Sequence, residues 1–373
     1  MRMRRSSLQS LIIPILSVAL AVAAGSLFMW GAGYDALAAY GGMFTGAFGS
    51  PTAIGRTLLN AVPFVFAGLS VAFAFKGGLF NIGGEGQLFL GAVTSAWIGL
   101  ALADWPGIAL MPLALLAGGL AGALWGALAG ALKAYTGAHE VITTIMLNYI
   151  AIVITGWLVS QGSRSQGIAP GPLRDPNPVN IVPRTARVVE AARLPGLFDL
   201  GSETIHAGLI LAVIAIAIVA FLIWRTTFGF EVRTVGQNPS AARYAGVNVP
   251  RITILTMAVS GALAGLAGAV ETLGRNFYFA PNFNVGYGFD SIAIALLGGN
   301  HPVGVGLAAL LFGGMDAGGT DMQFASRVPT EILQVVQALV LMFVAAPAIL
   351  RYLFRLRATK EDATTFSAGW GKR

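Results

Sequence analysis

The chain of 373 residues is too apolar for a soluble domain of average composition, because 56% of its residues are hydrophobic and only 10% are charged. It has no cysteine, which excludes a disulfide framework and thiolate chemistry, and its three histidines are too scattered to suggest a metal site. The net charge is +7, but the basic residues lie at the ends of apolar segments and in one long loop. This placement is typical of membrane orientation rather than of nucleic-acid binding, so we expect a membrane protein that binds no nucleic acid and no metal.

Apolar segments in the first half of the chain predict five membrane helices. The first follows a basic N-terminus and is about long enough to cross a bilayer, so we interpret it as an uncleaved helix that leaves residues 1–10 in the cytoplasm. The five helices are expected at residues 11–30, 58–75, 82–103, 108–135 and 141–160. Residues 161–204 then interrupt the pattern with prolines and charged residues, which predicts an extracytoplasmic loop or ordered cap.

The second half continues with a helix at 205–224, an arginine-marked cytoplasmic segment at 225–251 and a helix at 252–273. Glycines, Asn300, His301 and Pro302 interrupt the apolar segment 290–316, which predicts two short pieces instead of one span. Two pieces keep the basic residues after the last helix, 332–350, in the cytoplasm.

The expected fold is therefore an all-α polytopic membrane protein of about ten transmembrane helices, two of them short, with both termini cytoplasmic. The transmembrane domain is expected to cover residues 11–350, and a cytoplasmic tail residues 351–373. We find no convincing internal repeat, which neither supports nor excludes a secondary transporter built from inverted repeats.

A glycine-rich polar stretch at residues 76–87 places Asn81, Glu85 and Gln87 between apolar segments. Hydrocarbon cannot satisfy these groups, so they should face protein, water or a ligand. Thr144 and Asn148 lie four residues apart and share one face of a predicted helix, where they can meet the first three. We predict that these five side chains line a substrate path and offer hydrogen bonds to a sugar or a base. The alternative for Thr144 and Asn148 is helix-to-helix hydrogen bonding, worth about 0.6 to 2 kcal/mol per bond. For the glycine-rich stretch, the alternative is that the glycines only pack helices and Glu85 only pairs with a neighbouring helix.

Aromatic and acidic residues in the second half have two interpretations each. The aromatic side chains can stack on a nucleobase or anchor the chain at the membrane surface: Phe277, Tyr278, Phe279, Phe283 and Tyr287. Three carboxylates near predicted helix ends are expected to be solvated or to cap helices rather than to carry protons: Glu271, Asp290 and Asp316. We expect Asp290 in particular to cap the short piece 291–297.

The cytoplasmic segment contains the pattern of a short helix. Asn238 suits the N-cap, Pro239 the first helical position and Gly246 the C-terminal stop. A free helix of about two turns is marginal in water, so this one should be docked. Its small residues Ala241, Ala242 and Ala245, together with Arg243, suit a partner's groove, although packing on its own membrane domain is nearly as well supported.

Three segments carry a resemblance to a known family. Residues 237–246 (QNPSAARYAG) resemble the coupling-helix signature of ATP-binding-cassette (ABC) importer permeases of the branched-chain amino acid, ribose and nucleoside group. Residues 80–87 (FNIGGEGQ) and 140–150 (EVITTIMLNYI) resemble the nucleoside branch, which is linked to basic membrane proteins. The resemblance covers most of the chain, from about residue 55 to 350.

This resemblance implies an importer-type permease subunit in a bacterial cytoplasmic (inner) membrane, for nucleosides or, alternatively, for ribose or another simple sugar. It implies a second permease of a different chain, a separate cytoplasmic ATPase that binds ATP and Mg, and an extracytoplasmic binding protein. The coupling role falls on Asn238, Pro239, Ala241, Ala242, Arg243 and Gly246. The sequence has no G-x-x-x-x-G-K-[ST] phosphate loop, so we expect no ATP site, no cofactor and no enzyme activity in this chain. A less favoured alternative is a secondary transporter in which Glu85 carries a proton.

Overall fold

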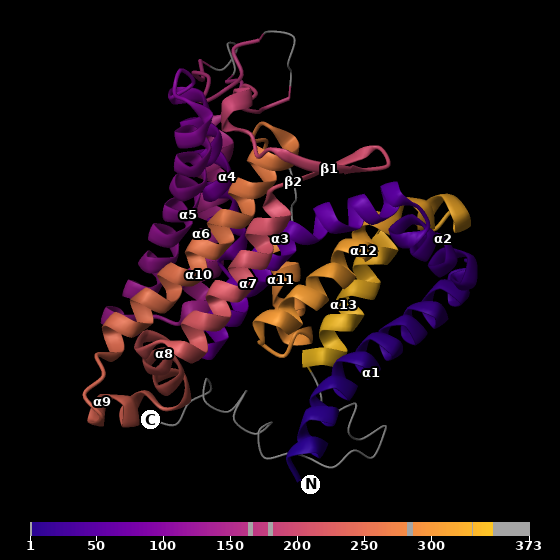
Figure 1. Cartoon of the computed structure of the whole chain (residues 1–373), viewed down its shortest axis with the longest axis horizontal. Coiled ribbons are helices and arrows are strands. Elements are labelled where there is room, and N and C mark those ends of the chain that lie inside the picture. The colour runs from indigo at the N-terminus through magenta and orange to yellow at the C-terminus, as the bar shows by residue number, and fades with distance from the viewer. Residues whose placement is uncertain (1, 163–166, 178–181, 282–285, 330, 346–373) are drawn as a thin grey trace.

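The computed structural model describes residues 2–162, 167–177, 182–281, 286–329 and 331–345. Within these residues the chain is predominantly helical, and six of the helices are long and apolar enough to cross a membrane. Together with the composition, this makes the chain a polytopic helical membrane protein. Figure 1 shows helices α8 and α9 at one end of the bundle, the end at which α1 also starts, and a β-hairpin towards the opposite end. We call these the α9 end and the hairpin end.

The first half forms six α-helices, each close to a predicted segment except the second. Their bounds are α1 (Arg2–Gly31), α2 (Ala36–Phe48), α3 (Pro51–Lys76), α4 (Gly84–Ala101), α5 (Gly107–Ala131), which continues as the π-helical turn η1 (Leu132–Thr136), and α6 (Glu140–Leu158). Helix α2 was not predicted, and the Asp35 carboxylate caps it by accepting hydrogen bonds from the backbone of Leu37 and Ala38. Helix α3 begins earlier than predicted because Ser50 caps it and Pro51 occupies its first position.

The second half begins with a small cap and continues with further α-helices. Its elements are η3 (Glu190–Ala192), strands β1 (Gly196–Leu200) and β2 (Glu203–His206), α7 (Gly208–Arg225), α8 (Thr227–Gln237), α9 (Pro239–Tyr244), α10 (Val249–Glu271) with the π-helical turn η4 (Thr272–Asn276), α11 (Tyr287–Leu297), α12 (Pro302–Ser326) and α13 (Glu331–Ala345). The antiparallel strands form the hairpin, so the chain is not purely α-helical. The end of the last predicted helix and the predicted tail lie outside the described residues.

The predicted interruption of the segment 290–316 is confirmed, because α11 ends at Leu297 and α12 begins at Pro302. The second piece is not short, however, since α12 has 25 residues. The expectation that Asp316 lies near a helix end is therefore wrong. The expectation that Asp290 caps a helix is also wrong: α11 begins three residues earlier, and Asp290 lies in its first turn.

Glycine contacts hold α10 in the centre of the bundle. Methyl groups at Gly122 and Gly126 of α5 would collide with the carbonyl oxygens of Gly261 and Met257 of α10, so the two antiparallel backbones touch directly. A methyl group at Gly91 of α4 would likewise collide with α10. Small residues permit this close packing where no hydrophobic driving force acts between helices. The contacts bring α4, α5 and α10 together around the polar stretch.

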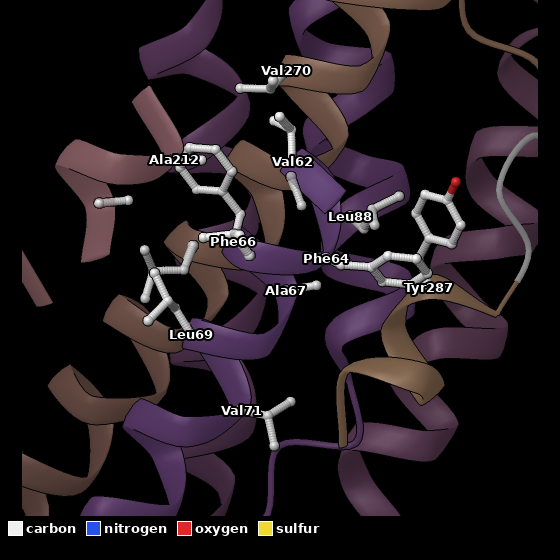
Figure 2. Packing of buried hydrophobic residues seen from close by; sticks show 14 of the residues in the cluster. Val62, Phe64, Phe66, Ala67, Leu69, Val71, Leu88, Ala212, Val270 and Tyr287 are labelled. Carbon is white, nitrogen blue, oxygen red and sulfur yellow. The ribbon is translucent and has the colours of Figure 1, made fainter. Parts of the chain in front are cut away.

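Helix α3 is the most buried span of the bundle, and 89% of its apolar window lies inside the described structure. Its Phe64 ring lies 4.5 Å from the ring of Tyr287 on α11 and 6.2 Å from that of Phe312 on α12. Figure 2 shows the Phe64 and Tyr287 rings side by side between the helices. These contacts pack α11 and α12 against the first half of the chain.

Candidate functional site

The polar stretch is a break between α3 and α4, and we call residues 76–87 the polar break. Asn81 and Gln87 are both 1% exposed and pair through their amides. The Asn81 side chain also donates to Ser260 Oγ of α10 at 2.8 Å and accepts from the Gly83 backbone at 3.0 Å. Ser260 in turn donates to the Ser70 carbonyl of α3. The amide pair therefore attaches the break to α10.

Glu85 joins the break to α11. Its two carboxylate oxygens accept hydrogen bonds from the backbone nitrogens of Gly286 and Gly288, at 2.8 and 2.7 Å. A carboxylate at this position complements the positive end of the α11 dipole, so Glu85 performs the capping that was predicted for Asp290. A methyl group at Gly288 would collide with the Glu85 backbone, which explains why glycine is needed there.

Asn148 joins the break to α6. Its Oδ1 accepts from the Gly86 backbone and its Nδ2 donates to the Ile82 carbonyl, both at 2.8 Å. The Thr144 hydroxyl donates to the Glu140 carbonyl of its own helix, and its Cβ packs against Gly83. The structure thus brings all five predicted side chains together, and it adds Ser260, Gly286 and Gly288 as partners that no local pattern indicated.

The polar groups of this site bond to one another in the conformation described. A substrate that contacts Asn81, Glu85, Gln87 or Asn148 must exchange one of these protein bonds for its own, since the side chains are at most 3% exposed. Their role in a substrate path stays a prediction. What the geometry adds is that one short stretch binds three different helices, so a shift of the break must change α6, α10 and α11 together.

The described aromatic residues after α10 all have protein partners. The Phe277 and Phe279 carbonyls accept from Val188 and Thr185 of the loop that precedes the hairpin, and the Arg193 guanidinium lies 4.6 Å from the Phe277 ring centre. Tyr278 lies beneath Arg184 in the same way, and Tyr287 packs against Phe64. These contacts hold the loop on the bundle. Stacking on a nucleobase stays a prediction, and Phe283 lies outside the described residues.

Helix α9 starts as predicted. Asn238 Oδ1 accepts from the Ala241 backbone at 3.0 Å, Pro239 is the first helical residue, and Gly246 adopts φ +85° just after the helix. Ala242 is fully buried against the chain's own core. The other five predicted coupling residues are exposed: Asn238, Pro239, Ala241, Arg243 and Gly246. One alanine thus attaches the helix, and the remaining surface is free to meet a partner.

One further residue of this surface was not predicted from the sequence. Tyr244 is 95% exposed at the last position of α9. Tyrosine and arginine are enriched where partners contribute most binding energy. Tyr244 beside Arg243 therefore belongs to the candidate docking surface, and only its place in the QNPSAARYAG segment could have indicated it.

Helix α8 connects α9 to the polar break through glycine contacts. A methyl group at Gly236 of α8 would lie 2.8 Å from the backbone of Gly77 and Gly78, and one at Gly78 would lie 2.9 Å from the Gly236 carbonyl oxygen. Phe228 of α8 also stacks on Phe73 of α3, with 6.2 Å between ring centres. These contacts place α8, the neighbour of α9, in direct backbone contact with the residues just before Asn81.

Comparison with known proteins agrees with the resemblance. The model of the family described as branched-chain amino acid transport system, permease component, matches residues 53–345. The chain is 40% identical to the guanosine ABC transporter permease protein NupP of Bacillus subtilis, over 93% of this chain and 96% of that protein. It is 35% identical to the nucleoside ABC transporter permease protein NupB of Lactococcus lactis, over 97% and 98%.

A relative named for a different substrate is the glucose ABC transporter permease protein TsgB13 of Haloferax volcanii, 37% identical over 88% of this chain and 86% of that protein. No solved structure matches. The family match over most of the chain, its high identity to ABC permeases and the helical membrane fold agree with one another. The chain belongs to the family of permease components of the branched-chain amino acid transport system type.

Proposed function

We propose that this chain is the permease subunit of an ATP-driven ABC importer for nucleosides. It forms the translocation path with a second permease, a different chain, and couples to a separate ATPase that binds ATP and Mg. The observation that carries the proposal is the exposed α9 helix, whose neighbour α8 touches the polar break through Gly236 and Gly78. The nucleoside assignment is supported by the high identity to a guanosine permease and to a nucleoside permease.

The proposed orientation places the α9 end in the cytoplasm of a bacterial cell. About ten helices then enter the inner membrane, α1, α3 to α7 and α10 to α13, with α2 outside the count, and the eleven-residue α11 is too short to span it alone. Both termini lie in the cytoplasm, and the hairpin end faces an extracytoplasmic binding protein. Arginines in and around α8 and α9 support this orientation, since basic residues accumulate on the cytoplasmic side: Arg225, Arg233, Arg243 and Arg251.

In the proposed mechanism, ATP-driven movement of the ATPase displaces α9, and α8 passes the movement to the polar break. Asn81, Glu85 and Asn148 attach the break to α10, α11 and α6, so these helices change position together. Such rigid-body movement opens the path alternately to each side. Asn81, Glu85, Gln87, Thr144 and Asn148 would meet the substrate when these bonds exchange.

Import of glucose or another simple sugar is the second candidate, and the glucose permease relative supports it. A proton-coupled transporter is less well supported. Both Glu85 oxygens accept backbone hydrogen bonds, which is a role for a fixed carboxylate rather than for one that gains and loses a proton during transport.

The test is uptake into proteoliposomes that contain this chain, its second permease, the ATPase and the binding protein. We expect ATP-dependent uptake of labelled guanosine. Ribose, glucose and leucine serve as controls and should not be taken up. Uptake of a sugar alone would refute the nucleoside assignment but would leave the assignment to the permease family unchanged. Uptake driven by a proton gradient without ATP would refute the coupling to an ATPase.

A further inference from the structure

Three polar side chains from distant parts of the chain meet near the hairpin end. Asn60 of α3 donates to Asp316 Oδ2 of α12 at 2.9 Å, and Arg275 of η4 donates to Asn60 Oδ1. The Arg275 guanidinium also lies 3.9 Å from the carboxylate of Glu271. We call Asn60, Arg275 and Asp316 the outer cluster. None of the three takes part in the polar break.

The position of the outer cluster follows from its neighbours. Asn60 lies one helical turn from Arg56, which forms a 3.0 Å ion pair with Glu203 of the hairpin. Arg275 lies two residues before Phe277, whose carbonyl holds the loop that precedes the hairpin. The cluster therefore lies between the hairpin and the polar break, on the side where the proposed function places substrate delivery.

Two charged side chains of the outer cluster are exposed and can contact a solute. Asp316 and Arg275 are exposed, and Asp316 Oδ1 has no hydrogen bond among the described residues. Asp316 lies within a 25-residue helix that can span a membrane, where a charged side chain faces water or a partner rather than lipid. An exposed carboxylate with one free oxygen on such a helix can accept hydrogen bonds from a passing solute.

The charges near the outer cluster favour a neutral polar solute. Tyr287 lies within electrostatic range of four charged side chains, Glu271, Arg275, Asp290 and Asp316, and its ring packs on Phe64 (Figure 2). Three carboxylates and one guanidinium leave this region with a net negative charge, which disfavours phosphorylated nucleotides. Carboxylate oxygens instead match the vicinal hydroxyls of a ribose.

We propose that the outer cluster binds the ribose of the substrate before it reaches the polar break, with the Asp316 carboxylate accepting from the ribose hydroxyls and Arg275 and Asn60 orienting it. This inference rests on the proposed function. A single charge-assisted hydrogen bond of this kind changes binding or rate by about tenfold or more when it is lost.

The test measures turnover in proteoliposomes at saturating nucleoside, which removes the affinity of the binding protein from the comparison. Guanosine is compared with 2′-deoxyguanosine for the wild type, Asp316→Asn and the matched control Asp321→Asn, whose carboxylate lies on the same helix and has no bond to the cluster. We expect Asp316→Asn to lower guanosine turnover about tenfold and to affect 2′-deoxyguanosine much less. Asp321→Asn should leave the ratio of the two rates unchanged.

A second measurement is independent of transport. Saturation-transfer NMR of guanosine with the detergent-solubilised permease and ATPase complex, without binding protein, should show the strongest transfer to ribose protons, and Asp316→Asn should abolish that transfer. The inference would be overturned by an equal loss of turnover for both nucleosides or by unchanged ribose signals in Asp316→Asn. It would also be overturned if the purified variant had lost the second permease. In the last case the cluster is a subunit contact. If the wild type transports no nucleoside at all and guanosine shows no transfer, the proposed function fails first.

Discussion

The contact between Gly78 and Gly236 gives the sharpest test of how α9 is coupled to the polar break. Gly78 has φ +68°, so alanine there costs about 1–2 kcal/mol in backbone strain alone. Its methyl group would also lie 2.9 Å from the Gly236 carbonyl oxygen and 3.0 Å from the Gly236 Cα. Ordinary contacts need several tenths of an ångström more, and both atoms are backbone, so α8 must move. Overpacking of this kind adds about 1–3 kcal/mol.

Gly137 provides a matched control, because it has φ +72° and a methyl group added there would have no atom within 4 Å among the described residues. Gly137→Ala therefore reports backbone strain without the contact. We expect Gly78→Ala to lower the thermal unfolding temperature more than Gly137→Ala does, and to reduce guanosine uptake per ATP hydrolysed in proteoliposomes while Gly137→Ala keeps this ratio. Equal effects of the two substitutions on uptake per ATP would refute transmission through this contact.

Three further outcomes are expected. Glu85→Gln removes the charge that caps α11, so it should lower thermal stability by about 1–3 kcal/mol yet retain part of the ATP-driven uptake; complete loss with normal membrane insertion would contradict this. Arg243→Glu should leave the folded permease in the membrane but prevent co-purification of the ATPase, because it reverses the charge of the exposed α9 surface. Burial, and then the charge of Arg275, lower the pKa of His206 to about 4 from 6.5, and its Nδ1 accepts from the Gly208 backbone. Below about pH 6.5 the unfolded chain therefore binds a proton on His206 that the folded chain binds only near pH 4. The free energy of unfolding should fall by up to about 3 kcal/mol as the pH drops from 6.5 to 4. The unfolding temperature of His206→Gln should fall less than that of the wild type over the same pH range.

Segments of uniform apolar character were located well from the sequence, because about 20 such residues are what a bilayer requires. Helix α2 and the hairpin were missed, since neither has that length and both depend on local capping and on docking to neighbours. The capping role given to Asp290 was wrong because a competing carboxylate, Glu85, reaches the α11 backbone from another helix. Only tertiary structure determines which of two carboxylates takes such a position.

The part of the site that the sequence predicted correctly rests on the periodicity of a helix. Thr144 and Asn148 were expected to face the polar break because four residues place two side chains on one helix face, and the structure confirms that they do. Ser260 lies on α10, and no spacing marks it as the partner of Asn81. Asn60 and Asp316 are 256 residues apart, so their bond is likewise beyond any local pattern.

The two polar sites are physically connected through α11. Eleven residues make this helix too short to span the membrane, so its position depends on what holds its ends. Glu85 holds the first end through Gly286 and Gly288, and Tyr287 lies between these two glycines. A movement of the polar break must therefore carry Tyr287 with it, and Tyr287 borders the outer cluster. In the proposed transporter, a displacement of α9 therefore also moves the proposed ribose site. The reason is that Glu85, which caps α11, belongs to the polar break.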